Sequence, residues 1–127
     1  MGTKKILLVD DDSDVRTVVR DVLEVSGYQI WEASDGLEAL NIWKTQASQI
    51  DLLLADMAMP GSLNGRQLAD RLRREQPGLK VIFMSGHIPN LALKTQFHGC
   101  FLQKPFSPEG LAEIVRSNLN PALTADG

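Results

Sequence analysis

The sequence predicts an α/β fold, in which helices cover both faces of a doubly wound, parallel, five-stranded sheet. Five short apolar runs are bounded by turn residues, and most lack the alternation of a half-exposed strand, which is typical of strands buried on both faces. Segments with helical spacing lie between these runs. Strict alternation of strands and helices implies right-handed crossovers, and hence a parallel sheet.

The predicted strands are residues 6–9, 28–31, 52–55, 81–84 and 100–102. The first predicted helix follows the first strand, because its apolar residues repeat at the spacing of one helix face. These residues are Val15, Val18, Val19, Val22 and Leu23. We expect Asp12, Ser13 and Asp14 to serve its N-terminus, where free N–H groups need acceptors, and Gly27 to end it.

The second predicted helix starts at Asp35, with Glu38 three residues later as in a capping box, and carries Leu37 and Leu40. A short helix is expected between Pro89 and Phe97, although its apolar residues make no clean stripe.

Two further helices have clear boundaries. One begins near Asn64 or Gly65 and ends at Pro77, and the last has Ser107 as its cap and Pro108 at its first position. Their apolar faces comprise Leu68, Ala69 and Leu72 in the former, and Leu111, Ile114, Val115 and Leu119 in the latter. The former also carries four arginines expected mostly to face water: Arg66, Arg71, Arg73 and Arg74.

Length and composition limit the function classes. The 127 residues, 43% of them hydrophobic, suffice for one domain, expected over residues 4–120, with a flexible tail at 121–127 that has no periodicity. A formal charge of −3 gives no broad basic surface, so direct nucleic-acid binding is not expected. No apolar run approaches the ~18 residues that span a bilayer, and no membrane association or signal peptide is expected.

The single cysteine, Cys100, excludes a disulfide within the chain and fits a reducing compartment. Because it lies in an apolar stretch, we expect it to pack in the core. These features together predict a cytoplasmic location.

Three carboxylates, Asp10, Asp11 and Asp12, directly follow the first strand, and Asp14 lies close behind. Two carboxylates about 4 Å apart repel by roughly 4 kcal/mol at an effective dielectric near 20, so a converging acidic cluster needs a cation. Ligands that are all oxygen favour a hard ion, Mg²⁺ or Ca²⁺, over zinc.

Side chains with reactive groups follow three other strands as well. Ligands of such sheets bind at the carboxyl ends of the strands, near the point where the strand order reverses. Asp56 follows the third strand, Ser85 the fourth and Lys104 the fifth. Each of these residues alone has a plain structural explanation as a turn residue, a cap or a solvated charge. Their joint arrival at one edge of the sheet makes that combined explanation improbable.

This set of groups suits phosphoryl transfer to a carboxylate. Asp56 would be the nucleophile, and Asp10 and Asp11 would help to hold a divalent ion that neutralises the phosphoryl oxygens. Lys104 would offer a positive charge to another oxygen, and Ser85 a hydrogen bond. Little more is needed, because phosphoryl transfer depends mainly on positioning and charge stabilisation.

From Ile6 to about Leu119, the chain resembles the receiver domains of two-component response regulators. The matching stretches are Leu7-Leu8-Val9-Asp10-Asp11, Asp56-Met57-Ala58-Met59-Pro60, Met84-Ser85-Gly86 and Lys104-Pro105-Phe106. Each stretch is a modest pattern, but their order and spacing are highly specific. The resemblance implies a flavodoxin-like (βα)5 fold with strand order 2-1-3-4-5.

The resemblance also implies a phosphoacceptor signalling domain rather than an enzyme. Such a domain catalyses its own phosphorylation and its own slow dephosphorylation. Asp56 would accept a phosphoryl group from phosphohistidine on a sensor histidine kinase or a histidine phosphotransfer protein. Asp11, Asp56 and the backbone carbonyl of Ala58 would ligate Mg²⁺ directly, while Asp10 would act through water.

Ser85 and Phe101 match the switch pair of the family. The hydroxyl would turn toward the phosphoryl group and the ring would move inward, which alters a partner-binding face built from the fourth helix, the fifth strand and the fifth helix. Lys104–Pro105 matches a bond that the family commonly holds in cis, which positions the lysine.

The sequence departs from the family at four positions. One extra residue lies between Pro60 and Gly65, beside the expected metal site. Ala58 and His87 occupy two variable positions that modulate phosphoryl loss, and Ala58 cannot orient a water molecule, so the lifetime of the phosphoryl group stays open. Phe101 keeps the ring of the usual tyrosine but loses its hydroxyl.

The acidic run has two other possible interpretations, a calcium-binding loop and a phosphatase motif. Asp10, Asp12 and Asp14 have the spacing of a calcium-binding loop, but Val15 stands where that loop requires glycine, and a strand precedes the run. Asp10 and Asp12 also match the first motif of phosphatases of the haloacid-dehalogenase type. That class needs a later acidic pair and usually a cap domain, and the sequence after Ser85 offers neither.

A receiver-like interaction module that takes up no phosphate is disfavoured, because the full acidic, serine and lysine set is present. The chain alone leaves open whether it is a stand-alone regulator or part of a larger protein. Its Arg-rich helix and residues 101–106 resemble receivers attached to hybrid sensor histidine kinases.

Overall fold

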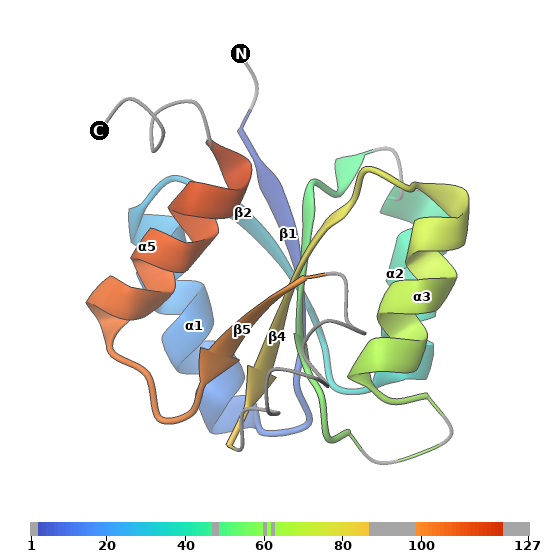
Figure 1. The fold of residues 1–127 in the computed structure, drawn as a ribbon, viewed down its shortest axis with the longest axis horizontal. Helices are drawn as coiled ribbons and strands as arrows, with labels where there is room; N and C mark the ends of the chain where they lie inside the picture. The colour runs from blue at the N-terminus through green and yellow to red at the C-terminus, as the bar shows by residue number, and fades with distance from the viewer. Residues whose placement is uncertain (1–2, 47–48, 60, 62, 87–98, 121–127) are drawn as a thin grey trace.

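The computed structural model describes residues 3–46, 49–59, 61, 63–86 and 99–120, and its five strands form one parallel sheet (Figure 1). The strands are β1 (Lys5–Val9), β2 (Gln29–Ala33), β3 (Leu52–Asp56), β4 (Lys80–Ser85) and β5 (Cys100–Gln103). The described helices are α1 (Ser13–Val25), α2 (Gly36–Gln46), α3 (Gly65–Glu75) and α5 (Pro108–Leu119). The strand order is β2-β1-β3-β4-β5, which confirms the predicted fold.

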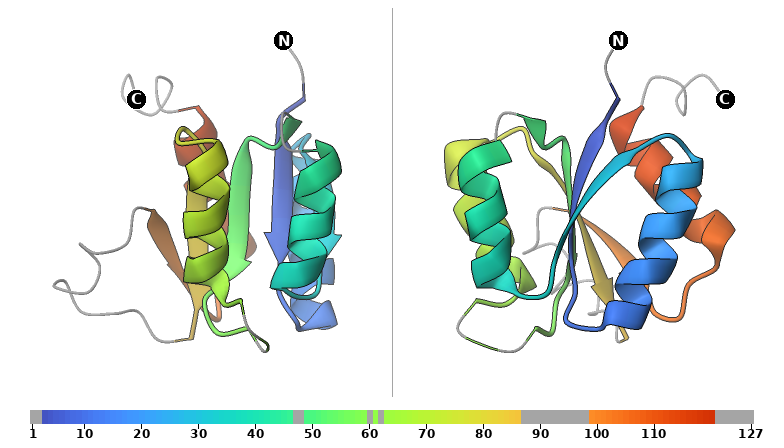
Figure 2. Two further views of the ribbon diagram at one scale, coloured as in Figure 1. Left: turned by 90° about the vertical axis from the view of Figure 1, so that its right-hand side faces the viewer. Right: turned by 180° about the vertical axis from the view of Figure 1, so that it is seen from behind.

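Helices lie on both faces of the sheet: α2 and α3 cover one face, and α1 and α5 cover the other (Figure 2). Alternate residues of each strand supply the two cores. Leu7 and Leu53 pack toward α2 and α3, whereas Leu8 and Leu54 pack toward α1 and α5. Every residue of β3 is buried. Burial on both faces is the physical reason for the continuous apolar runs in the sequence.

The helix starts follow the predicted capping chemistry, with one variation. The carboxylate of Asp12 accepts hydrogen bonds from the amides of Asp14 (2.9 Å) and Val15 (3.4 Å). The Asp35 carboxylate accepts from the Glu38 amide at 2.8 Å, but the Glu38 carboxylate accepts from the Ser34 amide and not from that of Asp35. Helix α2 therefore has only half of the predicted capping box.

Helix α3 has the complete box. The side chain of Asn64 accepts from the Gln67 amide, and the side chain of Gln67 accepts from the Asn64 amide, both at 2.9 Å. In α5, Ser107 Oγ accepts from the Gly110 amide at 2.9 Å, and Pro108 occupies the first position as predicted.

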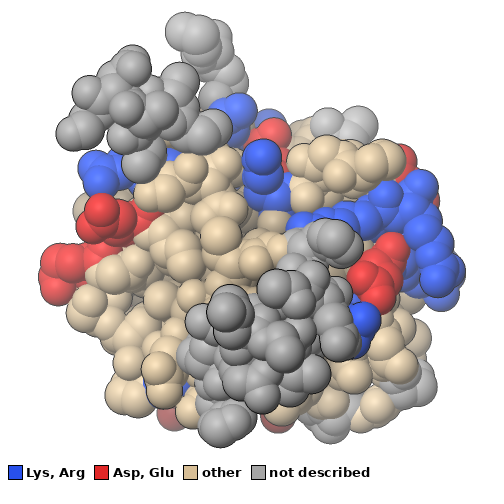
Figure 3. Space-filling model, in the orientation of Figure 1, with Lys and Arg blue, Asp and Glu red and all other residues tan. Residues whose placement is uncertain are grey.

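The arginines of α3 face water as expected. Arg66, Arg71 and Arg74 are exposed and Arg73 is half-buried, and the right-hand side of Figure 3, over α3, shows the basic side chains gathered there. This local basic patch coexists with a net acidic chain.

One burial prediction is wrong. Cys100 is exposed instead of packed in the core, because it begins β5 at the edge of the sheet, where its Sγ lies 3.7 Å from Asn118 Oδ1 of α5. Leu37 is 62% exposed, because α2 turns Ala39 and Trp43 toward the core instead.

Several expected features lie outside the described residues: the short helix between Pro89 and Phe97, His87, and the tail at 121–127. Within the described residues, the helices are too short or too polar to cross a membrane.

Candidate functional site

Three carboxylates meet at the carboxyl ends of β1 and β3, the neighbouring strands at which the strand order reverses. Asp10, Asp11 and Asp56 each offer an oxygen atom, and these three atoms lie within 4.8 Å of one another. Asp10 is fully buried and Asp56 is 7% exposed, whereas Asp11 is exposed. We call these three residues the acid cluster. Its all-oxygen donor set fits a hard divalent cation such as Mg²⁺.

Both carboxylate oxygens and the amide of Asp10 have hydrogen-bond partners. Its Oδ1 accepts from the Asp12 amide at 2.9 Å, and its Oδ2 accepts from Lys104 Nζ at 2.8 Å. Its own amide donates to the carbonyl of Ala33, the last residue of β2, at 3.1 Å. A buried carboxylate without such partners would cost several kcal/mol, on the order of the ion desolvation penalty.

Asp56, the last residue of β3, shares the same lysine. Its Oδ2 accepts from Lys104 Nζ at 3.3 Å, and its Oδ1 accepts from the Ala58 amide at 3.1 Å. The backbone of Gly65 lies close to that of Asp56: a Cβ added to Gly65 would lie 2.3 Å from the carbonyl oxygen of Asp56. Only glycine at position 65 lets α3 start this close to the acid cluster.

The loop between β3 and α3 is also fixed from a second direction. Leu63 packs against the core beneath α2 and α3, and a Cβ added to Gly36, the first residue of α2, would lie 2.8 Å from Leu63 Cβ. Gly61 has φ +93°, a backbone conformation that glycine adopts without strain. The extra residue noted in the sequence lies in this loop.

The charges in the site oppose one another. Burial raises the pKa of Asp56 above its ordinary value, and the neighbouring Asp10 charge adds to this, while the Ala58 amide and Lys104 act in the opposite direction. Burial lowers the pKa of Lys104, but the hydrogen bonds and charges of Asp10 and Asp56 outweigh it, so the net pKa is raised. Lys104 therefore stays cationic, and three carboxylates facing one ammonium leave an excess negative charge suited to a divalent cation.

The remaining predicted residues lie at the same edge of the sheet. Ser85 ends β4, one residue beyond Met84, which pairs with Asp56, and its carbonyl accepts from the Lys104 amide at 2.7 Å. The Lys104–Pro105 bond is cis. Phe101 of β5 is half-buried, and its ring centroid lies 5.6 Å from that of Phe83.

Sequence reasoning missed two residues beside the acid cluster. Arg16 of α1 donates through Nη1 to the carbonyl oxygen of Asp10 at 2.5 Å, and its Nε lies 3.4 Å from Glu32 Oε1 of β2. A contact between a helix and a neighbouring strand leaves no local pattern. The only sequence signal was the pair Arg16 and Arg20, which lie one turn apart on the polar side of the helix.

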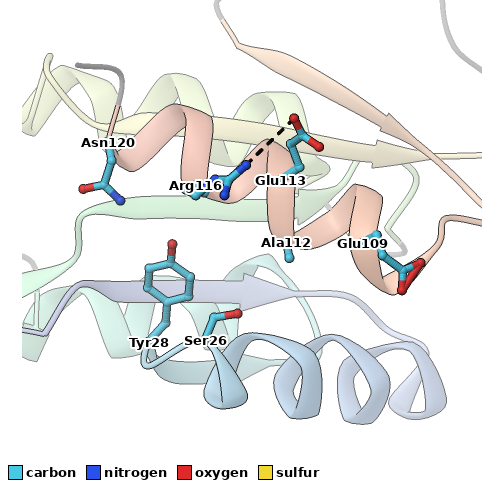
Figure 4. A pocket seen from close by; sticks show the side chains of 7 residues that line it. All are labelled: Ser26, Tyr28, Glu109, Ala112, Glu113, Arg116 and Asn120. Atoms are coloured by element: carbon cyan, nitrogen blue, oxygen red, sulfur yellow. Dashed lines mark ion pairs between the residues drawn. The ribbon is translucent and has the colours of Figure 1, made fainter. Parts of the chain in front are cut away.

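A hollow lies between α1 and α5 (Figure 4), and we call it the α1–α5 groove. Tyr28, which precedes β2, extends toward α5, and Arg116 of α5 lies 3.9 Å from Glu113. The lining residues are Ser26, Tyr28, Glu109, Ala112, Glu113, Arg116 and Asn120. Burial raises the pKa of Tyr28, and the Arg116 charge opposes this. The groove contains no converging carboxylates among the described residues, so the acid cluster is the stronger candidate for phosphoryl chemistry.

Comparison with known families decides the assignment. The model of the response regulator receiver domain matches residues 6–116. The chain belongs to this family. Receiver domains are the phosphoacceptor modules of two-component signalling, and the predicted resemblance is confirmed at this level.

This receiver domain is similar to parts of larger proteins and to single domains. It is 36% identical over 123 residues to the sensor kinase CckA of Brucella abortus, which covers 93% of the chain and 13% of that kinase. It is 34% identical over 87 residues to the sporulation initiation phosphotransferase F of Bacillus subtilis, which covers 68% of each.

The crystal structure of the receiver domain of the hybrid histidine kinase CckA has a TM-score of 0.79 and 37% identity to this receiver domain, over 91% of this chain and 99% of the other. The chain spans from 13% to 53% of the length of the four curated relatives CckA, NtrC of Azospirillum brasilense and two ycf27 regulators.

Proposed function

We propose that this receiver domain accepts a phosphoryl group on Asp56 from a phosphohistidine, with Mg²⁺ held by Asp10, Asp11, Asp56 and the carbonyl of Ala58. The observation that carries the proposal is the ammonium of Lys104, which binds Asp10 and Asp56 at 2.8 and 3.3 Å in the acid cluster. When bound, Mg²⁺ would neutralise phosphoryl oxygens. Asp10 would act through water, as the family resemblance implies.

The chain's own residues have defined parts in this transfer. An oxygen of Asp56 forms the new bond to phosphorus while the bond from phosphorus to the imidazole nitrogen breaks, and that nitrogen recovers the electron pair and takes up a proton. The Ala58 amide and Lys104 hold the Asp56 carboxylate in place. After transfer, Lys104 is positioned to bind a phosphoryl oxygen.

Ser85 and Phe101 form the proposed switch. Ser85 stands beside Lys104 at the end of β4, and Phe101 contacts Phe83 two residues before Ser85 on the same strand. Movement of the Ser85 hydroxyl toward the phosphoryl group would therefore change the packing of the Phe101 ring on β5. The downstream partner would bind the face of β5 and α5; the expected helix between Pro89 and Phe97, which would complete this face, falls outside the described residues.

A hollow beside the acid cluster fits the phosphohistidine donor. It is lined by Asp14, Val15, Val18, Lys104, Pro105 and Phe106, which are mostly apolar, and Val18 is 52% exposed. Because Lys104 lines the hollow and also contacts Asp10 and Asp56 of the acid cluster, a partner seated here would present its histidine to Asp56. We infer that a helical phosphohistidine domain of a sensor histidine kinase or phosphotransfer protein occupies it.

Incubation with Mg²⁺ and acetyl phosphate tests the phosphoacceptor. We expect an acid-stable, base-labile adduct that borohydride reduction places on Asp56 and that Asp56→Asn abolishes. The matched control is Asp12→Asn, because Asp12 caps α1 and is outside the acid cluster. A label on Asp10 would favour the phosphatase interpretation, and the absence of any adduct would favour a binding module without phosphate.

Donor docking is tested with two exposed valines of the same helix. Val18→Asp is expected to slow transfer from a phosphorylated kinase or phosphotransfer protein at least tenfold, while acetyl phosphate still labels Asp56. Val25→Asp, on a residue 89% exposed at the far end of α1, is expected to leave both reactions unchanged. Equal loss with both variants would contradict this docking surface.

Residues 4–120 are proposed to form the receiver unit, and the tail at 121–127 lies outside the described residues. A cytoplasmic location follows from the proposal, because the phosphohistidine donor is made with ATP. The similarity to CckA over its receiver domain supports attachment to a hybrid kinase, and a stand-alone regulator is the alternative. The full reading frame with its neighbouring genes distinguishes the two.

A further inference from the structure

Arg16 connects the backbone of the acid cluster to the neighbouring strand. Its Nη1 donates to the carbonyl oxygen of Asp10 at 2.5 Å, while its Nε lies 3.4 Å from Glu32 Oε1. Its side chain is only 18% exposed, less than that of Glu32 at 28%. An arginine this enclosed, with two partners on separate segments, is restricted to one geometry.

The carbonyl that Arg16 binds belongs to the peptide unit between Asp10 and Asp11. Its orientation sets where the chain continues into Asp11, the exposed member of the acid cluster. The Asp10 carboxylate has its own supports in the Asp12 amide and Lys104. Asp11 instead depends on the backbone that presents it, so the guanidinium acts where the cluster has the least support.

Glu32 in turn fixes Arg16. Its two oxygens contact different arginines of α1: Oε1 forms an ion pair with Arg16 Nε at 3.4 Å, and Oε2 accepts from Arg20 Nη1 at 2.9 Å. Glu32 also lies on β2 directly before Ala33, whose carbonyl accepts from the Asp10 amide. The Asp10 backbone is therefore held on both sides by consecutive residues of β2, once directly and once through Arg16.

We propose that Arg16, held by Glu32, is a positioning residue that orients the Asp10–Asp11 peptide so that the acid cluster binds its divalent cation. This inference rests on the proposed function. Arg16, although cationic, would strengthen cation binding by the acid cluster, because it fixes the geometry of the ligands.

The sign of the effect separates geometry from charge. The guanidinium is positive, so through charge alone its removal would tighten Mg²⁺ binding. Loss of a group that orients metal ligands instead weakens binding, typically about 10- to 100-fold when such outer-shell partners are mutated. The two explanations therefore predict opposite changes in the dissociation constant.

The experiment measures Mg²⁺ binding to the full chain by isothermal titration calorimetry. We expect Arg16→Gln to raise the dissociation constant about tenfold. Arg20→Gln is the matched control: it removes the same charge from the same helix and releases only Glu32 Oε2, leaving Oε1 paired with Arg16, and the Arg20 side chain has no hydrogen bond to the acid cluster in the described structure. It is expected to stay within twofold of the parent.

A second readout needs no metal. In the metal-free protein, the amide resonances of Asp11 and Asp12 are expected to shift in Arg16→Gln and to stay in place in Arg20→Gln. Arg16→Lys, which keeps the charge but not the two-partner geometry, is expected to fall between parent and Arg16→Gln, and it replaces that variant if Arg16→Gln does not fold.

Equal or tighter Mg²⁺ binding by Arg16→Gln would overturn the inference, as would an equal loss in Arg20→Gln. A parent protein that binds no Mg²⁺ at all would instead contradict the proposed function. The phosphorylation rate gives the final distinction: in Arg16→Gln the Mg²⁺ concentration for half-maximal rate rises, while the rate at saturating Mg²⁺ is retained.

Discussion

The acid cluster and the α1–α5 groove both place carboxylates beside a cation, yet their chemistry differs. In the acid cluster, Lys104 Nζ lies 2.8 Å from a fully buried Asp10. In the groove, Arg116 and Glu113 are 3.9 Å apart, with 61% and 72% of their side chains exposed. The cluster gathers residues from separate strand ends, whereas the groove pair lies on one turn of α5. Burial and convergence, rather than charge alone, distinguish the acid cluster from a solvated surface.

The largest difference is expected on removing the two cations. Lys104→Met leaves two buried carboxylates without their ammonium, and we expect a loss of about 2–3 kcal/mol in the free energy of unfolding without metal. Arg116→Met breaks an exposed pair and should cost less than about 0.5 kcal/mol. Urea denaturation in the presence of a chelator measures both.

Addition of Mg²⁺ sharpens this test. The divalent ion is expected to recover part of the stability lost in Lys104→Met and to leave the Arg116→Met difference unchanged. Similar losses in the two variants would mean that the buried lysine contributes no more than a surface charge.

A methyl group tests the close approach beside Asp56. Gly65→Ala places a Cβ against the Asp56 carbonyl, and the forced backbone shift is expected to cost about 1–3 kcal/mol and to slow phosphorylation by acetyl phosphate. Gly110→Ala in α5, where a Cβ would lie 3.1 Å from Ser107 Oγ, is the control and should change stability by less than about 1 kcal/mol. Thermal unfolding and adduct formation are the measurements.

The raised pKa of Asp56 predicts a pH dependence. Burial raises it above the ordinary 3.8, so the folded state binds the proton more tightly than the unfolded state, and stability is lost as the pH rises through the raised value. Asp56→Asn cannot ionise and also relieves repulsion with Asp10. We expect its stability relative to the parent to increase from pH 4 to pH 7 without metal, measured by urea titrations; a constant difference would contradict this.

The smallest effect is expected in the groove. Burial raises the pKa of Tyr28 above its ordinary 10.0, so the folded state favours the neutral phenol. The contribution of this preference to the free energy of unfolding is lost only as the pH rises beyond that value. Tyr28→Phe should therefore match the parent's pH dependence near neutrality and become relatively more stable only under alkaline conditions. Absorbance of the phenolate in a pH titration checks the direction.

The fold and the members of the acid cluster could be predicted because both leave strong local signals. Strands buried on both faces produce apolar runs, and reactive residues directly follow them, as Asp10 and Asp56 do. The catalytic and switch roles of Ser85, Lys104 and Phe101 stay predictions, although the structure brings Lys104 to both buried carboxylates.

Other features had no comparable signal. Cys100 was misplaced because a three-residue apolar run does not reveal that its strand lies at the sheet edge. The sequence did not show which face of α2 is buried, because apolar residues surround much of the helix; the structure buries Ala39 and Trp43. The Arg16–Glu32 contact joins two elements whose pairing is a product of the fold, and only coordinates reveal it.

The loop between β3 and α3 is clamped at its end, with Leu63 against Gly36 and Gly65 against the Asp56 carbonyl. A change of length upstream of Leu63 would thus be absorbed near Gly61 and would leave these two contacts in place. For protein engineering, this makes position 61 a candidate graft point, where an inserted peptide or reporter would lie in the loop that follows the proposed phosphorylation site.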